Sequence, residues 1–175
     1  QIQIQERPSK GKNIVICLQR NKGWSMGKLS VVHWLESVIS KITKYSDRPI
    51  VIRLHPGDKK AIVDYLPLLL QKYRSNPKIK ISPFGTPLEQ DLNKAWAVVN
   101  HNSSSIVGPL IQGYPGFITD PERSQCAEVA HTDFSMIETP QQFDRQKWLE
   151  RISMFHWNFD ELSNGTAWKH MRDYV

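Results

Sequence analysis

Five short apolar runs alternate with amphipathic stretches along most of the chain, and this alternation restricts the fold more than any other feature. The runs are the expected strands, at residues 14–18, 50–54, 79–81, 96–100 and 116–119. Continuous apolar runs are typical of parallel strands, because both faces of such a strand are buried. Strands that alternate with helices form βαβ units with right-handed crossovers. We therefore predict an α/β fold with an open parallel sheet of about five strands and helices on both faces.

Apolar residues that recur every three or four positions predict the intervening helices. These lie at residues 29–42, 62–73 with a bend at Pro67, 87–94 and 105–112. Beyond the last strand we expect one helix through residues 143–155 and a final one through Leu162, Trp168 and Met171, both packed back on the sheet. Residues 1–12 are expected to be a polar tail or linker, and residues 13–175 a single Rossmann-like domain.

Composition excludes several classes of protein. At 175 residues, with 39% hydrophobic and 23% charged residues, the chain has the make-up of a globular domain. No apolar stretch approaches the ~18 residues that would span a bilayer. The two cysteines, Cys17 and Cys126, have no CxxC or Cys/His spacing, so we expect neither a metal nor another cofactor. Free thiols favour a cytoplasmic setting.

The charge is distributed unevenly. The chain carries +6 in total, but residues 1–80 carry +11 and residues 81–175 carry −5. Such asymmetry is compatible with nucleic acid, a membrane surface, a phosphate-bearing ligand, a docking face or a solvated basic surface.

Ligands of open α/β sheets bind beyond the carboxyl ends of the strands. The loops that follow the predicted strands there are residues 19–27, 55–60, 101–105 and 120–125. In the first loop, Gln19 and Arg20 begin a polar, basic segment without GxGxxG or GxxxxGK[ST], so it is either a surface loop or a phosphate site of another kind. Asp120 starts the last loop and can orient a sugar hydroxyl or cap a helix.

Two of these loops carry the strongest candidate residues. His55 and Pro56 come directly after a buried strand, where an imidazole can donate a hydrogen bond to a phosphate oxygen, although the pair can also be a simple turn. The fourth strand is followed by Asn102, Ser103, Ser104 and Ser105. One serine would suffice as a helix cap, and three favour an anion site at the helix start.

These motifs occur in a characteristic order: His55-Pro56, then Asn102-Ser103-Ser104-Ser105, then Leu110-x-x-Gly113-x-Pro115. This order, over about residues 50–120, resembles the donor-binding half of GT-B glycosyltransferases. The similarity is greatest to the bacterial capsule-type enzymes, the Kdo-transferase and sialyl- or polysialyltransferase-like group.

The resemblance implies that His55 is the catalytic contact to the donor phosphate and that Pro56 lines the nucleotide site. It implies that the three serines hold the phosphate of a CMP- or UDP-sugar, which is transferred to a saccharide acceptor in surface polysaccharide synthesis. Gly108-Pro109-Leu110 stands where related enzymes often have a ribose-binding acid. The family's acidic base lies in an N-terminal half, so we expect a preceding domain or a second subunit to supply it.

A different class of function stays open beside this one. The basic first half also fits a non-catalytic phosphate- or nucleic-acid-binding module. For the glycosyltransferase hypothesis the expected location is cytoplasmic, either free or peripheral at the inner face of the membrane.

Overall fold

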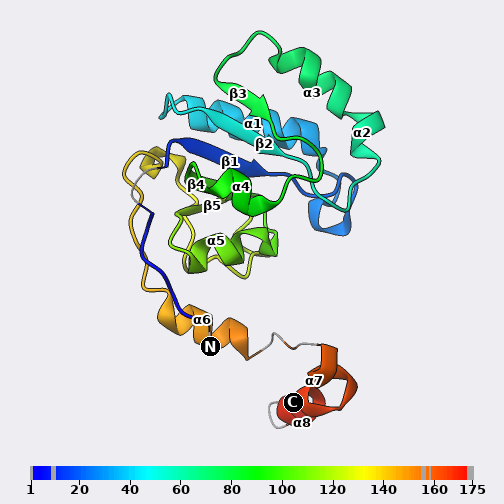
Figure 1. Cartoon of the computed structure of the whole chain (residues 1–175), viewed down its shortest axis with the longest axis vertical. Helices are drawn as coiled ribbons and strands as arrows, with labels where there is room; N and C mark the ends of the chain where they lie inside the picture. Colours follow the sequence, from blue (N-terminus) through cyan, green and yellow to red (C-terminus); the bar gives the residue numbers. More distant parts are fainter. Residues whose placement is uncertain (1, 9–10, 155–156, 158, 173–175) are drawn as a thin grey trace. The chain divides into compact units, whose positions relative to one another are not determined.

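The computed structural model describes residues 2–8, 11–154, 157 and 159–172, which fall into two compact units, Gln1–Phe143 and Asp144–Val175. The first unit contains a five-stranded parallel sheet in the order β3-β2-β1-β4-β5 (Figure 1). The strands are β1 (Asn13–Cys17), β2 (Ile50–Arg53), β3 (Ile79–Ile81), β4 (Ala95–Asn100) and β5 (Gly116–Ile118). The predicted open parallel α/β sheet is therefore confirmed, and each strand lies at one of the predicted apolar runs.

Helices cover both faces of the sheet, as predicted. On one face lie α1 (Val31–Thr43), α2 (Ala61–Asp64) and α3 (Leu66–Tyr73), whose Leu35 and Leu69 belong to one apolar core with Ile14 and Ile16 of β1. The connections to β4 and β5 carry α4 (Leu88–Leu92) and α5 (Val107–Ile111), which right-handed crossovers place on the opposite face. Three short 3-10 turns complete the described part of this unit: η1 (Trp24–Met26), η2 (Ser104–Ile106) and η3 (Phe134–Met136).

The expected bend in the second helix occurs two residues before its predicted position. The chain leaves helical geometry at Tyr65, with φ of −140°, and this residue separates α2 from α3. Pro67 lies in the first turn of α3, where its missing N–H leaves no hydrogen bond unmade. The proline thus marks the start of a helix and not a kink within one.

The N-terminal segment lies against the sheet unit without forming a helix or strand. Gln5 N–H donates to the carbonyl of Ile111 over 2.8 Å. The guanidinium of Arg7 lies 4.0 Å from the centre of the Trp96 ring, and that of Arg48 lies 3.6 Å from it. The Trp96 indole N–H donates to the carbonyl of Ile137 over 2.7 Å. Trp96 is thus contacted by segments from both ends of this unit.

The second unit is helical. Its elements are α6 (Gln146–Ser153), α7 (Phe159–Ser163) and α8 (Thr166–Met171). The prediction of one final helix through Leu162 and Trp168 is wrong, because Gly165 adopts φ of +78° and separates α7 from α8. Phe143 precedes α6, and the end of that predicted helix at Phe155 lies outside the described residues. Within the described part of the chain, no helix is long and apolar enough to cross a membrane.

Candidate functional site

A cleft of about 550 Å³ lies at the carboxyl ends of β1, β2 and β4. Its position spans the switch point between β1 and β4, where successive crossovers leave the sheet in opposite directions. The residues that line it come from the loops after these strands and after β5: Gln19, Arg20, Lys22, Gly23, Trp24, Ser25, His55, Asn102, Ser103, Ser104 and Arg123.

Six of the nine predicted site residues line this cleft: Gln19, Arg20, His55, Asn102, Ser103 and Ser104. The other three do not line it. Pro56 faces a neighbouring cavity of about 340 Å³ beside β3. The Ser105 hydroxyl accepts a hydrogen bond from Asn100 Nδ2 over 3.2 Å, and Asp120 is hydrogen-bonded to Asn102.

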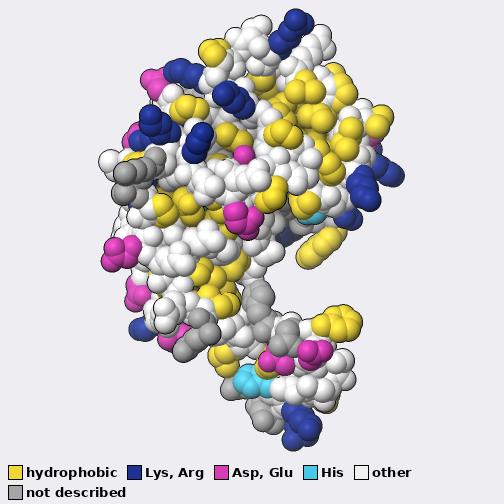
Figure 2. Space-filling model, viewed as in Figure 1, with side chains coloured by type: hydrophobic (Ala, Val, Ile, Leu, Met, Phe, Trp, Pro, Cys, Tyr) yellow, Lys and Arg dark blue, Asp and Glu magenta, His cyan; other side chains and the backbone are white. Residues whose placement is uncertain are grey.

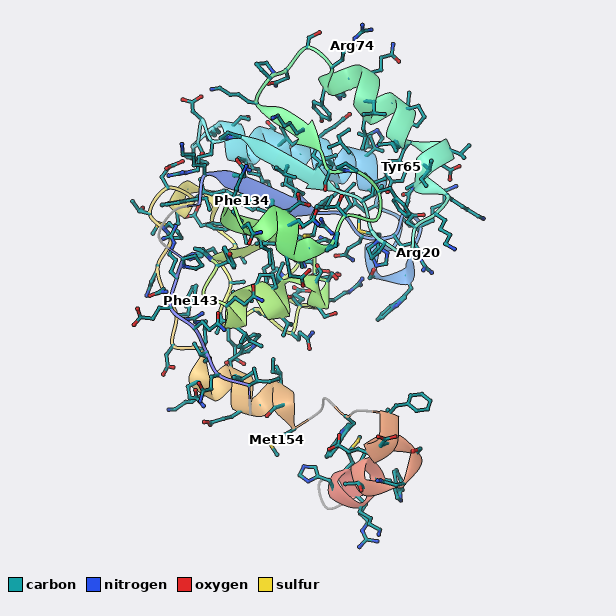
Figure 3. All side chains as sticks on the ribbon, viewed as in Figure 1. Arg20, Tyr65, Arg74, Phe134, Phe143 and Met154 are labelled. Carbon is teal, nitrogen blue, oxygen red and sulfur yellow. The ribbon has the colours of Figure 1, made fainter. Side chains whose placement is uncertain are left out.

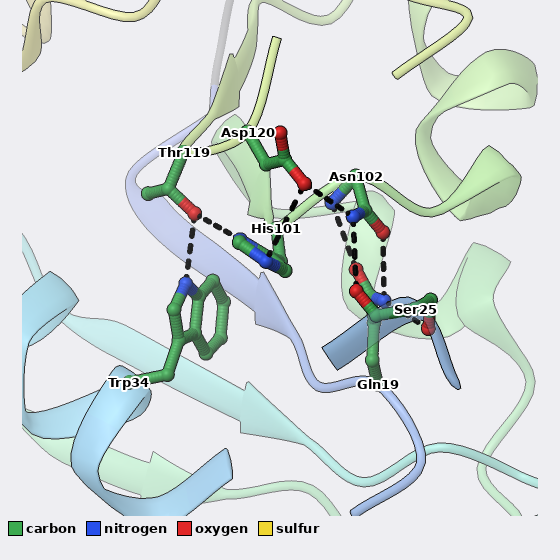
Figure 4. Close-up of polar contacts among 7 residues, drawn as sticks. All are labelled: Gln19, Ser25, Trp34, His101, Asn102, Thr119 and Asp120. Atoms are coloured by element: carbon green, nitrogen blue, oxygen red, sulfur yellow. Dashed lines mark hydrogen bonds and ion pairs between the residues drawn. The ribbon is translucent and has the colours of Figure 1, made fainter. Parts of the chain in front are cut away.

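Two buried amide side chains form the inner wall of the cleft. Gln19 Nε2 donates to Asn102 Oδ1 over 2.9 Å, and Asn102 N–H donates to Gln19 Oε1 over 2.8 Å. Gln19 Nε2 also donates to the Ser25 hydroxyl, and Asn102 Nδ2 donates to the Ser25 carbonyl (Figure 4). Because a buried amide is costly unless its donors and acceptors are satisfied, this network fixes the relative position of the loops after β1 and β4.

Asp120 does not line the cleft but accepts a hydrogen bond from Asn102, one of the two residues of this wall. Its Oδ2 accepts from Asn102 Nδ2 over 2.8 Å and lies 3.7 Å from His101 Nε2 (Figure 4). His101 Nδ1 lies 2.7 Å from the Thr119 hydroxyl, and the oxygen of this hydroxyl accepts from the Trp34 indole N–H over 2.8 Å. Burial is the main cause that lowers the pKa of His101, which favours the neutral ring. A neutral ring with Nδ1 accepting from Thr119 carries its proton on Nε2, on the side of Asp120.

His55 is oriented by its own turn. Its Nδ1 accepts from Gly57 N–H over 3.0 Å, so the proton of the neutral ring lies on Nε2. Burial, followed by the nearby Arg20 guanidinium, lowers the pKa of His55. Arg20 Nη2 in turn donates to the Gly57 carbonyl over 3.0 Å (Arg20 is labelled in Figure 3). His55 is thus a neutral hydrogen-bond donor at neutral pH, next to a permanent positive charge.

The two lining serines differ in their local roles. Ser103 Oγ accepts the Ser105 N–H over 3.1 Å and caps η2, as the capping alternative predicts for one serine. Ser104 is exposed to the cleft. It is therefore the serine whose hydroxyl can meet a ligand without giving up a cap.

Positive charge and one aromatic ring complete the lining. Arg20, Lys22 and Arg123 line the cleft, and no Asp or Glu is among its described lining residues. The Trp24 side chain is 89% exposed. Cations and hydroxyls suit a phosphate, and an exposed indole suits a stacked planar ring. The candidate loops 19–27 and 120–125 of the sequence analysis contain Lys22, Trp24 and Arg123, but none of the three was predicted as a site residue. The available signal for Trp24 was a tryptophan in a polar loop that follows a buried strand.

Among the described residues, no group of three or more His, Cys, Asp or Glu side chains is arranged to hold a metal ion. No protein-family model and no curated protein matches the chain. A function proposed for the chain therefore rests on its sequence motifs, its fold and the geometry of the cleft.

Proposed function

We propose that the cleft binds the nucleotide phosphate of a CMP- or UDP-sugar and that the chain takes part in glycosyl transfer for surface polysaccharide synthesis. The observation that carries this proposal is the convergence of His55 and Ser104 with three cationic side chains in one cleft. Convergence of donors without a lining carboxylate favours an anion over a neutral ligand or a metal ion.

His55 carries a hydrogen on Nε2, and this hydrogen is the donor that the proposed chemistry needs. In glycosyl transfer the bond between the sugar and the phosphate oxygen breaks, and negative charge grows on that oxygen. The Nε2–H of His55 donates to this oxygen, and Arg20 stabilises the same charge, as preorganised electrostatic stabilisation requires. In this proposal His55 stabilises the leaving group, and the base that activates the saccharide acceptor comes from a further domain or a second subunit.

Trp24 is the proposed platform for the nucleotide base. Stacking of a base on an exposed aromatic ring contributes about 1–3 kcal/mol. Asp120 does not take the role of a ribose ligand in this proposal, because its Oδ2 is bonded to Asn102.

The test is calorimetric titration of CMP and UDP into the full chain and its variants. Ser104→Ala and His55→Ala should each weaken binding by about 1.5–3 kcal/mol, the contribution of a hydrogen bond to a charged group. Trp24→Ala should weaken it by about 1–3 kcal/mol. Ser75→Ala, His33→Ala and Trp168→Ala change exposed residues outside the cleft and should bind as wild type. Equal affinity across all variants, or no binding by the wild type, would contradict the proposal.

A nucleic-acid-binding module is the second candidate, favoured by the exposed Trp24, two positions after Lys22, in residues 1–80, which carry +11. The two candidates differ in salt dependence. Each phosphate contact to nucleic acid adds about −0.7 to −0.9 to the slope of log K against log[salt]. Binding of a single-stranded oligonucleotide with a steep slope, together with no affinity for CMP or UDP, would favour the second candidate.

A further inference from the structure

A second surface, separate from the cleft, combines exposed aliphatic side chains with positive charge. We define the α2–α3 surface by its exposed apolar residues, Ile62, Val63, Leu68 and Leu70, and its basic residues, Lys59, Lys60 and Arg74. Val63 is 80% exposed and Leu68 is 60% exposed. None of these residues lines the cleft.

Two cavities flank α3 and accompany the exposed apolar residues of this surface. A cavity of about 400 Å³ lies on one side of α3, where Leu68 and Leu69 meet Val32 of α1. A second cavity of about 290 Å³ lies on the other side, where Leu70 and Tyr73 meet the edge strand β3. Apolar side chains are gathered over the α2–α3 region in Figure 2, with Lys and Arg at its margin. Exposed apolar side chains gathered in one region of the surface mark an interaction site.

The charge of the surface restricts its partner. Among the described residues, Lys59, Lys60 and Arg74 have no acidic partner within ion-pair distance, whereas Lys72 is paired with Glu36. Asp64 is the one acidic residue in the described segment 59–74. A second copy of the chain would bring the same positive charges together, so the surface is not suited to a symmetric dimer.

Composition distinguishes a lipid surface from a protein partner. Protein interfaces are enriched in aromatic residues, Met and Arg, and depleted in Lys. The exposed apolar residues defined above are all aliphatic, and two of the three basic residues are lysines. Helices that lie in the membrane interface bury Leu and other apolar side chains at the headgroup boundary and hold Lys and Arg at the level of the lipid phosphates.

We propose that the α2–α3 surface docks the protein on an anionic lipid bilayer. Ile62, Val63, Leu68 and Leu70 insert into the interface, while Lys59, Lys60 and Arg74 contact lipid phosphates. This attachment is peripheral and goes beyond nucleotide binding in the cleft.

The test is co-sedimentation of the full chain with phosphatidylcholine vesicles that contain or lack 30% phosphatidylglycerol, a composition chosen to give a strongly anionic surface. Wild type should bind only the anionic vesicles. Lys59→Gln/Lys60→Gln should weaken binding about 30-fold, from ~1 kcal/mol for each basic residue near an anionic surface. Lys41→Gln/Lys44→Gln removes the same charge from exposed residues at the C-terminal end of α1 and directly after it, and this pair should weaken vesicle binding several-fold less. Leu68→Gln/Leu70→Gln keeps all charges and should weaken binding at least 10-fold.

Three results would overturn the proposal: no binding of wild type to anionic vesicles, equal losses for the two lysine pairs, or a Leu68- and Leu70-dependent dimer in light scattering. Far-ultraviolet circular dichroism verifies that each variant is folded. His55→Ala should sediment with vesicles as wild type does, so failure of the nucleotide proposal and failure of this one are distinguishable.

Discussion

Asn102→Ala should destabilise the protein by about 3 kcal/mol although Asn102 lines the cleft and lies outside the apolar core. The substitution removes the bonds from Gln19 Nε2 to Oδ1, from Nδ2 to Asp120 Oδ2 and from Nδ2 to the Ser25 carbonyl. A neutral hydrogen bond contributes about 1 kcal/mol, and a bond to a charged group about 1.5–3 kcal/mol. The sum is moderated because Gln19 Nε2 keeps its bond to the Ser25 hydroxyl, which leaves a loss of about 3 kcal/mol.

Urea unfolding followed by circular dichroism measures this loss. With a slope of about 2 kcal/mol per molar urea, the midpoint should fall by roughly 1.5 M while the slope itself is unchanged. Asn93→Ala changes an exposed side chain directly after α4 and should change stability by less than about 0.5 kcal/mol.

A double-mutant cycle of Gln19 and Asn102, the two residues of the inner wall, tests the same network more directly. Because Gln19 and Asn102 share hydrogen bonds, Gln19→Ala/Asn102→Ala should cost at least about 0.5 kcal/mol less than the sum of the single substitutions. The reasoning is refuted if Asn102→Ala costs less than about 1 kcal/mol, or if the two substitutions are additive.

Two further predictions concern the His55 turn and the response to pH. A methyl group at Gly57 would lie 2.7 Å from Arg20 Nη2 and 3.1 Å from His55 Cε1, so Gly57→Ala should weaken CMP or UDP binding by roughly 5–10-fold. Gly108→Ala has open space around its added methyl and should bind as wild type in the same titration. Burial lowers the pKa of His55, His101 and His131 in the folded chain, so the unfolded chain takes up protons first as the pH falls. The free energy of unfolding should therefore be retained above about pH 6.5 and decrease below it, and the decrease should be shallower in His131→Phe. Urea unfolding at pH values between about 7.5 and 5.5 measures this dependence. An equal decrease with pH in wild type and in His131→Phe would reject this cause.

The strands were predictable because their signal is local. A parallel strand buried on both faces must be apolar along its whole length, and Ile14, Ile16, Ile50 and Ile52 satisfy this directly. The loops at the carboxyl ends then follow from topology, which is how His55 and the serines could be proposed as neighbours.

The features that the sequence did not reveal depend on contacts between distant residues. Gln19 and Asn102 pair across 83 positions, and this pairing requires β1 and β4 to be adjacent in the sheet. Asp120 has the character of a ligand residue in isolation, whereas its partner Asn102 gives it a positioning role. Arg123 lies in the cleft because of the path of an irregular loop after β5, for which no periodic pattern exists.

The contacts of Trp96 link the two ends of the sheet unit. Its indole contacts Arg7, which precedes it in the sequence, and Ile137, which follows it. Arg48, which also lies over the Trp96 ring, forms an ion pair with Glu138 at 3.0 Å. These contacts close two loops of the chain that meet at Trp96, one from Arg7 to Trp96 and one from Trp96 to Ile137. Opening either end removes contacts from the same side chain, so the first and last segments of the unit are expected to open and close as one cooperative element and not to fray independently.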